Sequence, residues 1–118
     1  MNRYAAVVPA AGFSSRMGKY KPLLTIGNET ITDRVISLFT RNEVDVFLVV
    51  GWQKDRLTAG IMHHDIRIIE NPDFRNGMFT SIKAGVASLE SDYHAFFILP
   101  VDIPLVRPIT IRYLLEKF

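Results

Sequence analysis

The sequence contains no cysteine, which excludes a disulfide framework, a zinc site built on thiolates and a cysteine nucleophile. It also has no long hydrophobic run, because its longest two, residues 44–52 and 95–101, fall far short of the roughly 20 residues that span a bilayer. No block of like charge is present, since the Lys and Arg residues are spread along the chain and the formal net charge is +2. These absences argue against a nucleic-acid or membrane partner, and a cytoplasmic protein is expected.

Short apolar stretches alternate with segments of helical spacing. The apolar stretches show little polar alternation, which predicts parallel strands covered on both faces, at residues 4–8, 46–50, 66–69 and 95–99. Helices are predicted at residues 32–39, 54–62, 78–89 and 109–118, with Thr32 as the N-cap of the first and a small hairpin at residues 25–30. This alternation predicts an α/β fold of the Rossmann-like three-layer α/β/α kind, with a mostly parallel sheet.

One compact domain is expected, because about 118 residues can enclose a single core but not two. The sequence ends on a predicted helix with no strand after it, and four parallel strands make a small sheet with an open edge. We therefore expect residues 1–118 to be the N-terminal part of a domain truncated at its C-terminus, or a chain that depends on fusion to or pairing with further domains.

The loop at residues 9–21 follows the first predicted strand, where open α/β sheets bind their ligands. Its small residues let the backbone approach anionic oxygens, and its hydroxyl and cationic side chains can bind phosphate. These residues are Ala10, Ala11, Gly12, Ser14, Ser15, Arg16, Lys19 and Lys21. Together they predict a polyphosphate-binding loop, although an ordinary solvated basic loop would use the same residue types.

This loop differs from the two common phosphate-binding motifs. A P-loop needs four residues between its glycines and a hydroxyl after its lysine, whereas five residues separate Gly12 from Gly18, and Tyr20 follows Lys19. The glycine fingerprint of dinucleotide-binding proteins is also missing, which disfavours a Rossmann oxidoreductase.

Three further positions are candidates for a ligand site at the ends of predicted strands. Gly77 and Ser81 lie where the third strand leads into a helix, so that backbone N–H groups and a hydroxyl can meet a base edge or a phosphate. Asp102 follows the fourth strand, and a single carboxylate combined with substrate phosphates is a usual way to hold Mg²⁺. A turn glycine, a turn serine and an N-cap aspartate remain the structural alternatives.

The sequence patterns of these segments resemble the motifs of one protein family. The run Ala10-Ala11-Gly12-x-Ser14-x-Arg16-Met17-Gly18-x-x-Lys21 resembles the signature of the MobA-like nucleotidyltransferases, which include the enzymes that attach a nucleotide to molybdopterin. Residues 71–81 resemble the N-P-x-[WF]-x-x-G-M-x-x-S segment of its molybdopterin cytidylyltransferase branch, with Phe74 where Trp is commoner. Asp102-Ile103-Pro104 resembles the Asp-x-Pro metal motif of the family, whose members continue further and supply a second acidic metal ligand.

The resemblance implies a Mg²⁺-dependent nucleotidyltransferase that moves CMP from CTP to a phosphorylated acceptor, molybdopterin, in molybdenum cofactor biosynthesis, and releases pyrophosphate. It implies catalytic roles for Arg16, Lys21 and Asp102, with Asp102 as the metal ligand. The nucleotide would be bound by Ala10, Ala11, Gly12, Ser14, Ser15, Gly51, Gly77 and Ser81. Three alternatives stay open: the same chemistry with GTP, the same chemistry with a sugar phosphate or phosphocholine as acceptor, and a non-catalytic nucleotide-binding module of a larger protein.

Replacing Lys21 by Ala should weaken nucleotide binding, because the ammonium group is one of the few cations that the loop offers to a triphosphate. Titration calorimetry with CTP measures the change. An affinity equal to that of the unmodified protein would contradict the assignment of residues 9–21 as the triphosphate-binding loop.

Overall fold

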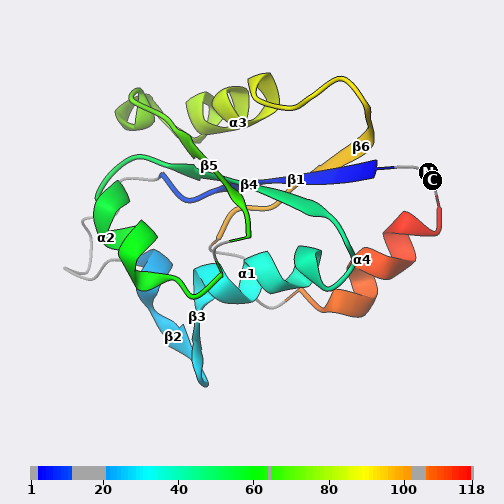
Figure 1. Cartoon of the computed structure of the whole chain (residues 1–118). Helices are drawn as coiled ribbons and strands as arrows, with labels where there is room; N and C mark the ends of the chain where they lie inside the picture. Colours follow the sequence, from blue (N-terminus) through cyan, green and yellow to red (C-terminus); the bar gives the residue numbers. More distant parts are fainter. Residues whose placement is uncertain (1–2, 12–20, 64, 102–105, 118) are drawn as a thin grey trace.

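A four-stranded parallel sheet lies between two layers of helices (Figure 1). The computed structural model describes residues 3–11, 21–63, 65–101 and 106–117. The strands follow the order β5 (Arg67–Glu70), β4 (Asp45–Val50), β1 (Arg3–Pro9) and β6 (Tyr93–Ile98) across the sheet. One face carries α1 (Ile31–Thr40), α2 (Lys54–Gly60) and α4 (Pro108–Leu115), and the other carries α3 (Met78–Ala87). The expected three-layer α/β/α fold is confirmed.

Shorter elements complete the chain. The expected hairpin consists of β2 (Thr25–Ile26) and β3 (Glu29–Thr30), which pair antiparallel. Two 3₁₀ turns were not expected from the sequence: η1 (Lys21–Leu23) and η2 (Phe74–Asn76). None of the helices in the described part of the chain is long and apolar enough to cross a membrane.

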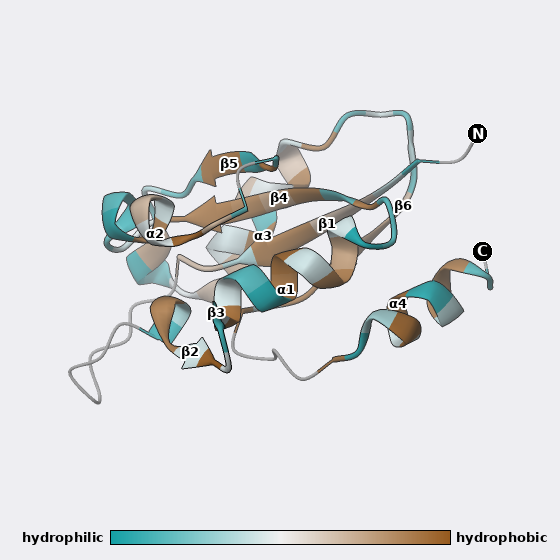
Figure 2. Ribbon diagram, turned by 60° about the horizontal axis from the view of Figure 1, so that its bottom comes forward, coloured by the Kyte–Doolittle hydropathy of each residue, from teal (hydrophilic) through white to brown (hydrophobic). Residues whose placement is uncertain are grey.

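The central strands β1 and β4 are the most continuously hydrophobic part of the ribbon (Figure 2). Helices cover both of their faces, which is why these strands lack polar alternation. On the α3 face the helix comes close to the sheet through Gly85, where a Cβ atom would lie 2.3 Å from Val7 Cγ1 and 3.1 Å from Val49 Cγ2. The missing side chain therefore sets how closely α3 can approach the two central strands.

Both edge strands depart from the expected pattern. In β5 only Ile69 is half-buried and the other residues are exposed, so the prediction of cover on both faces is wrong for this strand. Residues of β6 alternate between half-buried and exposed, so the prediction that this strand is covered on both faces is wrong. Phe96 and Ile98 are 45% and 41% exposed because α3 lies over β1 and β4 rather than over β6. Met78 and Val86, expected on the buried stripe of α3, are also exposed.

The prediction that Thr32 is the N-cap of α1 is wrong. The N-cap is Thr30, whose Oγ1 accepts a hydrogen bond from the Asp33 N–H at 3.0 Å. Thr32 is instead buried within the helix, and its Oγ1 donates to the carbonyl oxygen of Pro22 at 2.7 Å. Because β3 ends immediately before α1, the chain turns into the helix two residues earlier than the hydrophobic spacing indicated.

Asp33 joins this helix start to the segment after α2. Its side chain is 1% exposed, and its carboxylate accepts hydrogen bonds from the N–H groups of Met62 and His63 and from the Thr30 hydroxyl, at 3.0 to 3.1 Å. The helix was expected to continue to Met62, but it ends at Gly60, and Met62 is exposed. The carboxylate thus satisfies two backbone donors that lie outside any helix.

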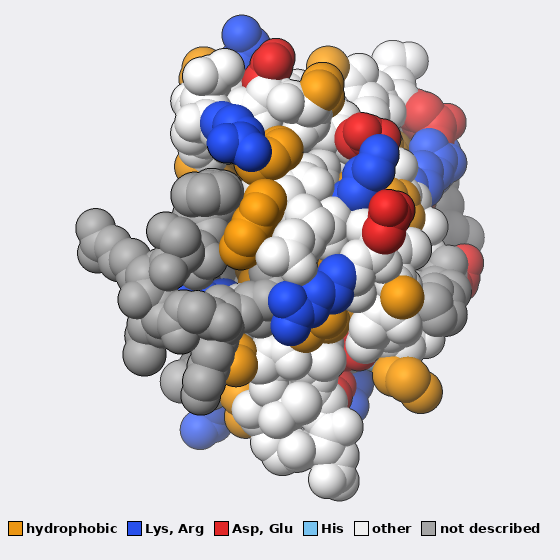
Figure 3. Space-filling view, turned by 90° about the vertical axis from the view of Figure 1, so that its left-hand side faces the viewer, with side chains coloured by type: hydrophobic (Ala, Val, Ile, Leu, Met, Phe, Trp, Pro, Cys, Tyr) orange, Lys and Arg blue, Asp and Glu red, His pale blue; other side chains and the backbone are white. Residues whose placement is uncertain are grey.

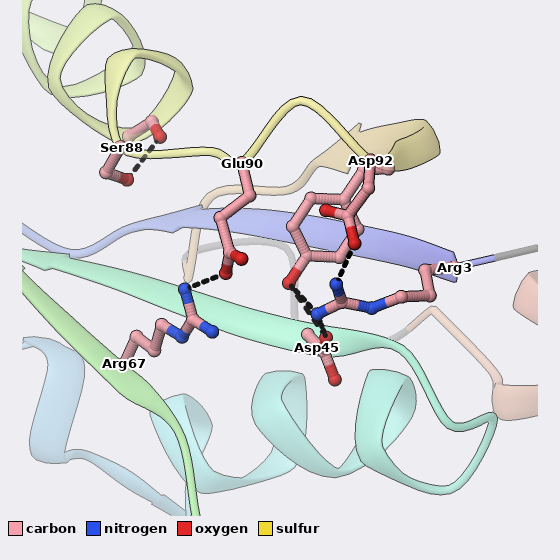
Figure 4. A network of polar contacts seen from close by, with 8 residues as sticks. Arg3, Asp45, Arg67, Ser88, Glu90 and Asp92 are labelled. Atoms are coloured by element: carbon pink, nitrogen blue, oxygen red, sulfur yellow. Dashed lines mark hydrogen bonds and ion pairs between the residues drawn. The ribbon is translucent and has the colours of Figure 1, made fainter.

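A polar network lies at the end of the sheet where the strands begin (Figure 4). Arg3 pairs with Asp92 and with Asp45, at 3.1 Å from the latter, and its guanidinium lies over the Tyr93 ring. The Tyr93 hydroxyl donates to Asp45 at 2.8 Å. Partial burial and this hydrogen bond raise the pKa of Tyr93 to about 12. The network links the amino ends of β1, β4 and β6.

Replacing Asp33 by Ala should lower the free energy of unfolding by about 1–3 kcal/mol, because it leaves the partly buried N–H groups of Met62 and His63 without their acceptor and removes one partner of the helix cap. Chemical denaturation measures this loss. Asp55 provides a control, since it is exposed in the first turn of α2 and its replacement by Ala should cost less than about 1 kcal/mol. Equal losses for the two variants would contradict the role given to Asp33.

Candidate functional site

Backbone hydrogen bonds align the carboxyl ends of the four parallel strands. The Ala10 N–H donates to Val49 O at 2.8 Å, and the Asn71 N–H donates to Val50 O at 2.8 Å. On the other side of β1, the Val101 N–H donates to Pro9 O at 3.3 Å. The segments that leave these strands therefore start side by side, and they are the segments in which the sequence placed its candidate residues.

The first loop enters the site with two buried residues. Ala10 and Ala11 are 2% and 0% exposed, so the start of the loop belongs to the hydrophobic core. Gly12, Ser14, Ser15 and Arg16 lie outside the described residues, as does Asp102 beyond the fourth strand. Lys21 is exposed at the start of η1, and the hydrogen bond from Thr32 to Pro22 ties this turn to α1.

Gly51, at the end of β4, lies where three segments meet. A Cβ atom on it would come within 2.8 Å of Phe74 Cβ and 2.9 Å of Ala11 Cβ. The glycine therefore lets η2 pack against the first loop, which is a packing reason that the sequence did not reveal. The resulting contact joins the segment at residues 71–81 to Ala11, where the first loop begins.

The segment from Asn71 to Ser81 is held by one side chain. Asn71 is 3% exposed; its Nδ2 donates to Thr80 Oγ1 and to Ser81 Oγ, both at 2.9 Å, and its Oδ1 accepts from the Asp73 N–H at 3.0 Å. Ser81, expected to contact the base, is itself 3% exposed and bonded to this amide. The structural roles of Asn71 and Thr80 were not predicted from the sequence, although an asparagine at a strand end before a proline is a common turn signal.

Gly77 adopts a backbone conformation that other residues rarely take. Its φ is +103°, and no described atom lies within 4 Å of the position that a Cβ would occupy. Glycine is therefore required here by the backbone angle and not by crowding. The space beside Gly77 is open among the described residues, as close approach of a ligand would need.

The face formed by the carboxyl ends carries hydrophobic and basic side chains in its middle, whereas most acidic side chains lie toward the right-hand margin of the view (Figure 3). Lys54 pairs with Glu70 at 2.8 Å, and this hydrogen bond raises the pKa of Lys54. The guanidinium of Arg75 lies 5.5 Å from the centre of the Phe74 ring. Such a face suits an anionic ligand that also has an aromatic part.

The metal ligand that the sequence predicts, Asp102, lies outside the described residues. Among residues 3–11, 21–63, 65–101 and 106–117, no cluster of three or more His, Asp or Glu side chains could hold an ion. One carboxylate combined with nucleotide phosphates would suffice for Mg²⁺, so the role of Asp102 stays a prediction from the sequence. Val101, the residue before it, is buried and bonded to the end of β1.

Residues 6–118 match the family model of the MobA-like NTP transferase domain, so the chain belongs to this family. It is 32% identical over 105 residues to the molybdenum cofactor cytidylyltransferase of Escherichia coli K12, covering 88% of this chain and 54% of that protein. It is 29% identical over 120 residues to a probable molybdenum cofactor guanylyltransferase of Bacillus cereus AH187, covering 99% of this chain and 58% of the relative. The chain thus spans little more than half the length of these relatives.

The fold is also similar to that of a solved nucleotidyl transferase from Methanothermobacter thermautotroptrophicus. The TM-score is 0.85 and the sequence identity is 25%. The match covers 98% of this chain and 58% of the solved one.

Replacing Gly51 by Ala should lower the free energy of unfolding by about 1–3 kcal/mol, because the added methyl group would overlap Phe74 and Ala11. Thermal and chemical denaturation measure this loss. Adding Ala11→Gly should recover part of the stability, since it removes one of the two crowded methyl groups. Strictly additive effects of the two substitutions would show that the contact does not exist.

Proposed function

We propose that the protein transfers CMP from CTP to a phosphate of an acceptor, molybdopterin, and releases pyrophosphate. In this proposal, residues 1–118 form the N-terminal nucleotide-binding part of the transferase domain. Membership of the MobA-like family supports the reaction class, and the similarity to a molybdenum cofactor cytidylyltransferase supports the nucleotide and the acceptor. The observation that carries most weight is the convergence of the first loop, Gly51 and the segment after Asn71 at one end of the sheet.

The reaction needs positioning and charge neutralisation more than covalent chemistry. An oxygen of the acceptor phosphate attacks the α-phosphorus of CTP, a new phosphorus–oxygen bond forms, and the bond to the bridging oxygen of the β-phosphate breaks. Pyrophosphate leaves with the electron pair of that bond. Arg16 and Lys21 neutralise the triphosphate and the departing pyrophosphate, while N–H groups of Ala11 and Gly12 orient it.

Mg²⁺ is the proposed cofactor, held by Asp102 together with phosphate oxygens. When bound, it supplies Lewis-acid neutralisation of charge on those oxygens. The hydroxyls of Ser14 and Ser15 donate further hydrogen bonds to phosphate, and Gly77 leaves its backbone accessible on the nucleobase side. The base-side segment is fixed to the first loop by the contact of Phe74 with Gly51 and Ala11.

GTP is the second candidate nucleotide, because a probable guanylyltransferase is nearly as similar to this chain as the cytidylyltransferase is. The Ala10-Ala11-Gly12 wording of the loop resembles the cytidylyl branch, whereas guanylyltransferases more often have two glycines at this point. This difference favours CTP. A direct assay with each compound distinguishes molybdopterin from the alternative acceptors, a sugar phosphate and phosphocholine.

Pyrophosphate release with molybdopterin and Mg²⁺ should be faster with CTP than with GTP, and Asp102→Asn should slow it by at least about a hundredfold. The expected loss follows because the metal site depends on that carboxylate. Asp55→Asn, exposed on α2, is the control and should leave the rate unchanged. A faster rate with GTP would contradict the choice of CTP, and normal release by Asp102→Asn would contradict the metal role. Nucleotide binding without any release would favour a non-catalytic module.

A further inference from the structure

A hollow of about 270 Å³ lies between the end of α1 and the start of α4. The described residues that line it are Arg41, Asn42, Pro108, Ile109 and Arg112. Because Arg41 and Asn42 come just before β4 begins, the hollow lies at the end of the sheet where the strands start (Figure 1). It is therefore separate from the candidate nucleotide site, which lies at the carboxyl ends of the strands.

The walls of the hollow are held together by Asn42. Its Nδ2 donates to Leu38 O at 2.9 Å and to Pro108 O at 3.1 Å, so one amide joins the last turn of α1 to the first residue of α4. On the inner side of α4, Ile111 is 3% exposed and belongs to the hydrophobic core. The hollow therefore has walls of fixed position.

The two arginines of the lining have no carboxylate partner. Among the described residues, neither the Arg41 nor the Arg112 side chain makes an ion pair or a hydrogen bond. An arginine near the end of a helix often binds the last carbonyl groups. Here the carbonyls of residues 37–40 already accept hydrogen bonds from the N–H groups of residues 41–44 and from the Asn42 amide. Both guanidinium groups are thus available to a ligand.

The charge of this hollow is of one sign. No acidic side chain is among the described residues that line it, whereas two other hollows have mixed charge. One of these is lined by Asp45, Asp65 and Arg67, and the other by Asp73 and Lys83. Guanidinium groups present N–H donors in an arrangement that matches a carboxylate or a phosphate group. The lining between α1 and α4 therefore favours an anionic ligand.

The remainder of the lining indicates the size and character of that ligand. Pro108 and the exposed side chain of Ile109 add an apolar surface between the arginines and the start of α4. The volume is smaller than is usual for the sites of drug-sized molecules. A ligand smaller than a nucleotide, with an acidic group and a short apolar part, matches both features.

We infer that this hollow is a second ligand site, which binds a small organic anion. Its carboxylate or phosphate group is bound by Arg41 and Arg112, and its apolar part lies against Pro108 and Ile109. The inference goes beyond the proposed nucleotidyl transfer and does not rest on it.

The test titrates phenyl phosphate, benzoate, inorganic phosphate and uncharged benzyl alcohol into ¹⁵N-labelled protein and follows the NMR signals. Phenyl phosphate or benzoate should shift the signals of residues 41–42 and 109–112, with a Kd on the order of 1 mM. Benzyl alcohol should not shift them, because it lacks the charge. The lower of the two Kd values shows whether the site prefers a phosphate or a carboxylate group.

Arg41→Gln and Arg112→Gln should each raise the Kd for the preferred anion about tenfold, because each removes charge-assisted hydrogen bonds. Arg107→Gln is the matched control, since Arg107 is an exposed cation beside the same helix start but does not line the hollow. It should change the Kd by less than about twofold. Ile109→Ala should weaken binding of the aromatic anion and leave that of inorganic phosphate unchanged. All four residues are exposed, so Tm should stay the same.

An unchanged Kd in both Arg41→Gln and Arg112→Gln would overturn the inference. An equal effect of Arg107→Gln, or signal shifts confined to other parts of the chain, would also overturn it. Lys21→Ala distinguishes this site from the proposed triphosphate-binding loop, because it should leave binding in the hollow unchanged. Loss of phenyl phosphate binding in Lys21→Ala alone would contradict the second site while supporting the proposed function.

Discussion

Parallel pairing of β1 with a strand on each side is the constraint on which the site depends. Pro9, the last residue of β1, lies opposite Val49 of β4, and its carbonyl accepts from Val101 beyond β6. Because the strands run in one direction, the segments that leave them must start at the same edge. Burial of β1 by helices on both faces fixes that register, so the geometry of the site follows from the hydrophobic core.

Buried polar side chains fix the segments between helices and strands, which the hydrophobic core does not hold in place. Helices and strands are held by apolar contacts, but the segments between them have backbone groups that need specific partners. Asp33 supplies acceptors to the chain after α2, Thr32 ties η1 to α1, and Asn71 fixes the entry to α3. Each joins two segments that are apart in the sequence, and two of the three act on segments that carry candidate site residues.

The sequence predicted the helices and strands of the core well. It predicted less well those features that depend on how one element packs against another. The buried strands β1 and β4 appear as continuous apolar runs and the apolar face of α1 as helical spacing, so the type and place of these elements could be predicted directly. The cap at Thr30 could not, because Thr30 and Thr32 are both suitable cap residues and the end of the hairpin decides between them. Exposure of Phe96 and Ile98 depends on where α3 crosses the sheet, which no local pattern records. At the site, the resemblance to family motifs made Gly51, Gly77 and Ser81 candidate nucleotide-binding residues. The packing around Gly51 and the burial of Ser81 could be seen only in the structure.

The order of the strands also determines how the chain can fold. Arg3, at the start of β1, pairs in the sheet with Tyr93, at the start of β6, so strands from the two ends of the described chain are neighbours. Closing a loop of this size carries an entropic cost before its contacts form. During synthesis β1 can pair with β4 early, but its second edge has to wait until β6 emerges. The sheet therefore completes only after β6 has emerged, and this non-local pairing slows folding in comparison with a protein whose contacts are local.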